Sequence, residues 1–164
     1  MPTSSSKAAS LATPAQQLKT FIDRFDPPNQ RLIRGALAAL RKVYPTATRL
    51  VYDNYNALAI GFCAAPRAST CLVSVAAYAS GVNLYFYYGA SLPDPAHRLQ
   101  GAGSQGHFVR FEGAKTVRDP AIRALLRAAA LYAKTPLPTR GPGPLVIQSV
   151  SAKRRPRTAR RGVV

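Results

Sequence analysis

Two short groups of side chains in this sequence have the residue types that ligand binding uses. The first is the string Tyr52-Asp53-Asn54-Tyr55, in which tyrosine rings could stack on a planar ligand while the polar groups fix its orientation. The alternative is an ordinary turn, whose Asp and Asn side chains bond to the local backbone. We take Tyr52, Asn54 and Tyr55 as candidate ligand-binding residues.

A glycine-rich loop forms the second group and contributes the candidates Arg98, Gly101, Gly103, His107 and Arg110. Backbone N–H groups of such a loop can hold an anion, and the basic side chains would add charge. The alternative is a flexible connection in which glycine supplies positive φ angles. No GK[ST] string follows the glycines and no βαβ unit surrounds them, so the loop is neither a Walker loop nor a dinucleotide fingerprint.

Catalytic and metal-binding patterns are not found in the sequence. Two histidines and two cysteines are too few for a zinc constellation, and the Gly-x-Ser-x-Gly elbow of a serine nucleophile does not occur. Six acidic residues spread along the chain do not suggest paired carboxylates for acid–base work. We therefore expect no cofactor and no metal, and we favour a protein without enzymatic activity.

The two cysteines, Cys63 and Cys71, flank a predicted hairpin loop, so a disulfide between them is geometrically possible. We expect two reduced thiols instead, because the N-terminus shows no secretory signal and a cytoplasmic protein is kept reduced. No run approaches the roughly 18 apolar residues of a membrane span. A membrane partner is therefore not expected.

Charge is the most unusual property of the chain. Lys and Arg total 23 against six acidic residues, which gives a net charge of +17. This charge favours salt-dependent association with polyanions, although a compositional bias toward arginine would give the same number. The C-terminus is the most basic segment, and our candidate nucleic-acid-binding residues there are Lys153, Arg154, Arg155, Arg157, Arg160 and Arg161.

Three helices and five strands must position these groups. Thr13-Pro14, Asp26-Pro27 and Asp119-Pro120 each predict a helix start, because a capping side chain precedes a proline at the first helical position. Apolar residues at helical spacing follow each of them. Alternating or aromatic-rich strings predict strands over residues 49–52, 55–62, 71–78, 82–88 and 107–111.

Short links make these strands antiparallel neighbours, so we expect an α+β fold with the helices on one face of a five-stranded sheet. In the aromatic strand, alternation places Tyr85 and Tyr87 on one face and Phe86 and Tyr88 on the other. One face must pack against the helices, so at most one of these pairs is available to stack on nucleic-acid bases. Ordinary sheet packing is the alternative that we favour.

Domain boundaries follow from composition. We expect residues 1–12 to be disordered, residues 13–134 to fold, and residues 135–164 to form a linker rich in Pro and Gly followed by a basic, disordered tail. Within that last segment, the string Leu145-Val146-Ile147 is either an exposed apolar spot or a short edge strand.

Four strings occur in order between residues 18 and 133: Val51-Tyr52-Asp53-Asn54-Tyr55-Asn56-Ala57, Leu92-Pro93-Asp94-Pro95, Leu99-Gln100-Gly101-Ala102-Gly103 and Asp119-Pro120-Ala121-Ile122. They resemble the YdhG-like family of domains of unknown function. The resemblance implies a small α+β domain with helices on one face of an antiparallel sheet. Members have been likened to frataxin-type iron chaperones, and a hard cation of that kind needs an acidic surface. In this chain Asp23 and Asp26 stand among basic residues, which disfavours iron.

We therefore predict a small non-enzymatic domain that binds a ligand or partner through the Tyr52 to Tyr55 turn and the Gly101 to Arg110 loop. The alternative hypothesis is a nucleic-acid-associated protein that uses its basic surface and its C-terminal tail. Iron handling of the frataxin type is the third hypothesis.

Overall fold

The computed structural model describes residues 11–159. Of the segment 1–12, for which we expected disorder, only Leu11 and Ala12 are described. In chain order the elements are α2 (Pro14–Asp23), α3 (Pro27–Val43), β1 (Thr48–Asp53), β2 (Leu58–Cys63), η1 (Ala68–Thr70), β3 (Cys71–Tyr78), β4 (Gly81–Phe86), η2 (Gly89–Ser91), β5 (His107–Phe111), α4 (Ala114–Arg118), α5 (Pro120–Leu131) and β6 (Leu145–Val150).

The three predicted helix starts are confirmed, and two of them are capped as expected. Thr13 and Gln16 close a capping box, because each backbone N–H donates to the other side chain, at 2.8 and 3.2 Å. The Asp119 carboxylate accepts from the Ala121 N–H at 2.9 Å, where α5 begins. Asp26 behaves differently: its carboxylate makes no cap bond to α3 and accepts instead from a residue near the C-terminus.

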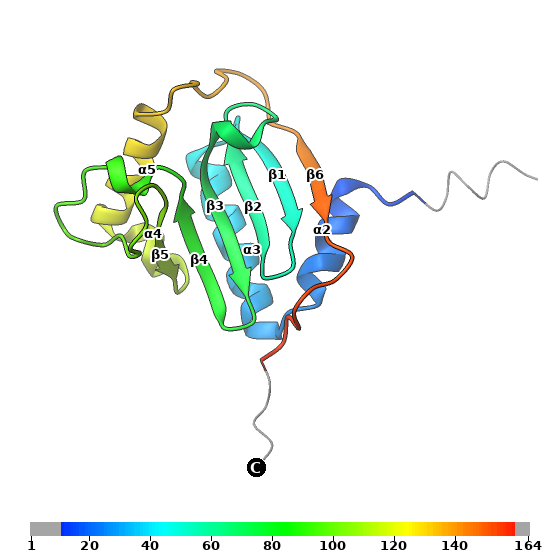
Figure 1. Cartoon of the computed structure of the whole chain (residues 1–164). Coiled ribbons are helices and arrows are strands. Elements are labelled where there is room, and N and C mark those ends of the chain that lie inside the picture. The colour runs from blue at the N-terminus through cyan, green and yellow to red at the C-terminus, as the bar shows by residue number, and fades with distance from the viewer. Residues whose placement is uncertain (1–10, 160–164) are drawn as a thin grey trace, which may run out of the picture.

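The strands form one mixed sheet in the order β5-β4-β3-β2-β1-β6. Strands β1 to β5 pair antiparallel with their neighbours, which confirms the α+β class and the predicted pairings. The sixth strand corrects the expected number of five, because β6 pairs in parallel with β1. Residues 145–150, which we had placed between the linker and the tail, thus close one edge of the sheet (Figure 1). Leu145 and Ile147 pack against the core, so the edge strand is the correct one of the two alternatives.

The helices cover one face of the sheet, and none of the described residues forms a helix on the other face, which is toward the viewer in Figure 1. The covered face buries alternate residues of the central strands, such as Ile60 and Phe62 of β2 and Leu84 and Phe86 of β4, against α3 and α5. The residues between them point the other way. We call the uncovered side the open face.

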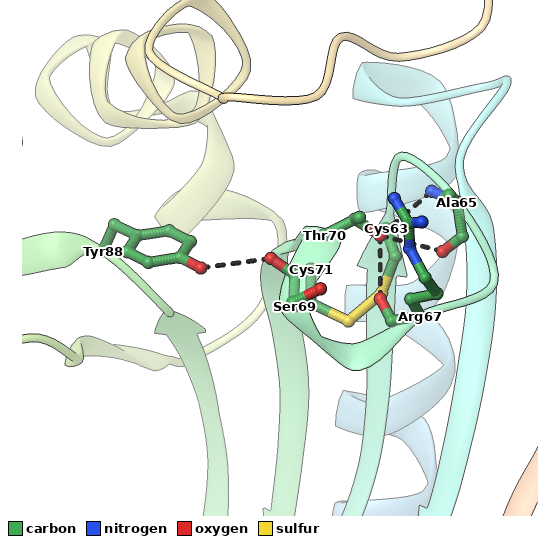
Figure 2. The surroundings of a disulfide bond; sticks show 7 residues. All are labelled: Cys63, Ala65, Arg67, Ser69, Thr70, Cys71 and Tyr88. Atoms are coloured by element: carbon green, nitrogen blue, oxygen red, sulfur yellow. Dashed lines mark hydrogen bonds between the residues drawn. A yellow bond between two sulfur atoms is a disulfide. The ribbon is translucent and has the colours of Figure 1, made fainter.

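Cys63 and Cys71 lie opposite each other at the ends of β2 and β3 and form a disulfide, with their Cα atoms 3.8 Å apart (Figure 2). This corrects our expectation of two reduced thiols. The hairpin itself aligns the two sulfur atoms, and its loop is tied further by the Thr70 hydroxyl, which accepts from the Ala65 N–H at 3.0 Å. From the other side, the Tyr88 hydroxyl donates to the Ser69 carbonyl at 3.1 Å.

Removal of this disulfide is expected to lower the free energy of unfolding by about 2.5 kcal/mol, because the bond restricts the unfolded chain. The effect is modest because the two cysteines are only 8 residues apart in the sequence. Urea unfolding of the wild type with and without dithiothreitol measures it, and a Cys63→Ser, Cys71→Ser double variant serves as the control that reductant should not affect. A wild-type midpoint that does not move with reductant would contradict the assignment.

Candidate ligand-binding groove

Small side chains occupy the middle of the open face. The register sets Ala59 beside Ala76, and Ser74 is the next open-face residue of β3, so small side chains line the groove at these three positions. Larger aromatic side chains stand on either side of them. A shallow groove with a volume of about 450 Å³ therefore lies over these strands.

Tyrosines form the walls of this hollow, which we call the tyrosine groove. Tyr55 follows β1, Tyr78 ends β3, and Tyr85 and Tyr87 stand on the opposite side. The rings of Tyr85 and Tyr87 meet edge to face, with their centroids 5.2 Å apart. The groove is lined by Asn54, Tyr55, Asn56, Ala57, Ala59, Ser74, Ala76, Tyr78, Tyr85, Tyr87 and Ser151.

Two phenol groups beside the groove are withdrawn from water. The Tyr52 hydroxyl is buried and has no hydrogen-bond partner among the described residues. Burial raises the pKa of the Tyr87 phenol, the nearby phenols of Tyr52 and Tyr85 raise it further, and the Ser74 hydroxyl acts in the opposite direction. The Tyr87 phenol is therefore protonated at neutral pH. A buried hydroxyl without a partner is unfavourable, and Tyr52 packs against the cluster of Leu50, Cys63 and Cys71 beside the groove.

Two glycines allow the tyrosines to lie where they do. A Cβ atom at position 61 would stand 3.0 Å from the Cys71 sulfur and 3.5 Å from the Tyr87 hydroxyl. A Cβ atom at position 106 would overlap the phenol of Tyr85. The last glycine of the glycine-rich loop therefore serves the packing of a groove tyrosine.

Asp53 turns to the helical side of the sheet, where it is completely buried. Its carboxylate accepts a hydrogen bond from Arg157 Nη2 at 2.8 Å, and it pairs with Arg154 Nε at 3.0 Å and Arg24 Nη1 at 3.1 Å. The Arg157 side chain is only 3% exposed, and its guanidinium lies 5.6 Å from the centre of the Phe25 ring. One buried carboxylate thus joins α2, β1 and the segment after β6.

This last segment, residues 151–159, is called the C-terminal arm below. It holds the β1–β2 turn, because Arg157 Nη2 donates to the Asn54 carbonyl at 2.6 Å and the Arg155 N–H donates to the Tyr55 carbonyl at 2.8 Å. The Arg155 guanidinium also lies 5.7 Å from the centre of the Tyr55 ring. The arm therefore fixes one wall of the tyrosine groove.

The arm corrects our expectation of a disordered tail over the part that the structure describes. Arg154 and Arg157 are ion-paired inside the fold, because Asp53 gives them a buried partner that sequence composition does not reveal. Lys153 and Arg155 are exposed. Arg160 and Arg161, the remaining nucleic-acid candidates, lie outside the described residues.

The candidates of the glycine-rich loop lie apart from the turn. His107 Nε2 is 2.7 Å from the Gly103 carbonyl oxygen, and Arg98 pairs with Asp119 at 3.2 Å. Gly101 has a φ angle of +118°, which glycine adopts most readily. His107 pairs with the last residue of β4, so Gly101 and Gly103 stand at the end of the sheet opposite the β1–β2 turn. The structure therefore does not join the two predicted groups into one site.

Arg110 is the loop candidate that does reach the open face. It belongs to a cross-strand row that crosses the whole face, Tyr52-Ala59-Ala76-Asn83-Arg110. Its guanidinium donates to the Asn83 side chain at 3.2 Å and to the Ser80 carbonyl. Arg110 thus stands on one side of the groove, and Tyr52 and Tyr55 stand on the other.

Several groove residues were not identified from the sequence. Ser74, Ala76 and Tyr78 alternate with Val73, Val75 and Ala77 of the main core, so the period of two did carry a signal. The alternation of β4 was interpreted correctly, because Phe86 is in the core and Tyr85 and Tyr87 share the open face. The strand register, which places these side chains around Ala59, could not be predicted from the sequence.

Searches for a metal site and for a membrane-spanning helix among the described residues, and comparisons with known proteins, add no assignment. Within residues 11–159, no three His, Cys, Asp or Glu side chains gather to hold a metal ion. None of the described helices is long and apolar enough to cross a membrane. Comparisons with models of protein families, with curated proteins and with solved structures found no match. The resemblance to the YdhG-like family stays a prediction from its four strings.

Proposed function

We propose that this protein is a non-enzymatic binding module that takes a planar ring of its ligand into the tyrosine groove. The observation that carries the proposal is the arrangement of tyrosine side chains around a floor of Ala59, Ser74 and Ala76. Such a floor lets a flat ring approach the sheet, and the tyrosines offer faces and edges to stack against it. Asn54 and Asn56, which line the groove, supply polar groups that such a ligand can bond to.

The chemistry of the lining supports binding over catalysis. The side chains that line the groove are those of Tyr, Asn, Ser and Ala, without a carboxylate, an imidazole or a free thiol. General acid–base work at neutral pH uses groups that titrate in that range, and the Tyr87 phenol is shifted away from it. The groove can therefore orient and stack a ligand but has no group suited to move its protons.

The site is also held rigid before any ligand arrives. Tyr78 and Tyr85 stand on paired strands, and the Tyr87 N–H donates to the Leu72 carbonyl of β3. The wall at Tyr55 is held by the Arg155 N–H, which donates to the Tyr55 carbonyl, and by Arg157, which donates to the Asn54 carbonyl. Preorganisation of this kind lowers the entropy that binding costs.

A panel of planar compounds, including nucleosides, flavins and aromatic amino acids, tests the proposal by thermal shift. Compounds that stabilise the wild type are expected to bind at least about five-fold more weakly to Tyr55→Ala, because one stacking partner is worth about 1 kcal/mol or more. Ala76→Leu, which fills the floor, is expected to abolish the shift.

The matched control is Tyr132→Ala, because Tyr132 is 63% exposed on the far layer and Tyr55 is 50% exposed at the groove. The control variant should keep the full thermal shift. Stabilisation that survives both Tyr55→Ala and Ala76→Leu would exclude the groove as the ligand site.

A further inference from the structure

We infer that the natural ligand of the tyrosine groove is a single-stranded nucleic acid. This inference rests on the proposed function, and it adds the class of ligand. The groove lining itself is uncharged, so the charges around the groove indicate which class of ligand it binds.

No acidic side chain lines the tyrosine groove. Asp53 is enclosed by arginines on the helical side, Asp23 pairs with Lys19 and Arg34, and Glu112 pairs with Lys115. The other three carboxylates accept backbone N–H bonds: Asp26 from the arm, Asp94 within its loop and Asp119 at the start of α5. These six are all the acidic residues of the chain, so a polyanion meets no carboxylate at the groove.

Two exposed guanidinium groups flank the groove from opposite sides. Arg110 stands on β5 beside Asn83, and Arg155 stands over the ring of Tyr55. Strands lie about 4.8 Å apart in a sheet, so the four intervals from β5 to β1 span roughly 19 Å. That is enough for a short stretch of a single strand, with its bases on the tyrosines and its phosphates on Arg110 and Arg155.

The same geometry argues against other ligands with rings. A neutral aromatic compound would occupy the groove but would bring no negative charge to Arg110 or Arg155. A duplex keeps the faces of its bases inside the stack, so it cannot present them to tyrosines on a sheet. A single strand is the polyanion whose bases are free to stack.

The helical side of the molecule is basic as well. Its charges lie away from the groove, so their removal tests whether net charge alone explains binding. A larger groove between α3 and α4 has an apolar floor and a rim of Arg31, Lys42 and Arg123. Loss of two of these charges reduces the attraction for any polyanion without touching the tyrosines.

Fluorescence anisotropy of the full chain with labelled oligothymidine and oligouridine of about ten nucleotides tests the inference, since single-strand-binding domains occupy about 4–16 nucleotides. Binding is expected at low salt, and the two oligomers separate a DNA ligand from an RNA ligand. Tyr55→Ala should weaken it five-fold or more. The pair Arg110→Gln, Arg155→Gln should flatten the slope of log K against log salt by about 1.4, since each phosphate contact on a single strand contributes about 0.7.

The matched control, Arg31→Gln with Lys42→Gln, should leave the Tyr55-dependent part of the affinity intact. The inference is overturned if neither oligomer binds, if a duplex of equal length binds as tightly, or if the control pair costs as much affinity as the open-face pair. If the oligomers do not bind while a planar compound binds in a way that depends on Tyr55, the nucleic-acid inference is wrong and the proposed ring-binding groove is supported. If nothing binds in a Tyr55-dependent way, both fall.

Discussion

The substitution Asp53→Asn is expected to lower the free energy of unfolding by about 3–5 kcal/mol, the usual cost of breaking a buried ion pair by removing one partner. Arg24, Arg154 and Arg157 all pair with this one carboxylate. An asparagine would remove the negative charge and turn an N–H₂ group toward guanidinium donors. Arg157 is the most affected, because its side chain is 3% exposed and cannot turn to water.

Urea unfolding of the variant and the wild type measures this effect. The control is Asp23→Asn, which breaks the exposed pairs of Asp23 with Lys19 and Arg34 and should change the stability by no more than about 1 kcal/mol. If Asp53→Asn were as harmless as Asp23→Asn, the arginine cluster would contribute nothing, and the arm would not be anchored as described.

A chain that ends at Pro144 is expected to lose its cooperative unfolding transition. The truncation removes β6, including the contacts of the partly buried Leu145 and Ile147 with the core, and two of the three arginines around Asp53. Two partly buried apolar side chains at about 1 kcal/mol each, added to an ion-pair loss of about 3–5 kcal/mol, reach the lower part of the 5–15 kcal/mol that holds a typical domain together. The edge of β1 would also be exposed, which favours aggregation.

Calorimetry and solubility of the truncated chain test this expectation. Arg157→Met in the full chain distinguishes the contribution of the arm from that of β6, because the variant loses the buried arginine and keeps the strand. Lys153→Met, at an exposed position of the same arm, is its control and should not change the melting temperature. A truncated chain that melts like the full one would show that residues 145–159 are not part of the fold.

Local signals were sufficient for most elements. A capping residue before a proline defined the starts of α2, α3 and α5, and a period of two defined strands that pair with their sequence neighbours. β6 was harder because it pairs in parallel with a strand nearly a hundred residues earlier, and no hairpin announces such a pairing. The short helix α4 was missed, since five residues carry too little periodicity.

The candidate site was predicted in part: residue type and strand alternation were visible in the sequence, and contacts between distant segments were not. Tyr52 and Tyr55 stood out by residue type, and alternation placed Tyr85 and Tyr87 on a common face. The partners of Asp53 could not be found, because Arg154 and Arg157 reach it only after β6 has joined the sheet. We predicted reduced cysteines because we expected a cytoplasmic protein, whereas the register of the hairpin brings the two cysteines together as a disulfide.

Isotope-labelled tyrosines test directly whether the open face is the surface that binds the ligand. The chain has eight tyrosines and no tryptophan, so tyrosine ring signals in NMR cover every wall of the groove. On titration with oligothymidine, the signals of the open-face tyrosines, Tyr52, Tyr55, Tyr78, Tyr85 and Tyr87, are expected to shift, and those of Tyr44 and Tyr132 to stay. Binding that shifts Tyr132 while the open-face tyrosines stay unchanged would contradict the account.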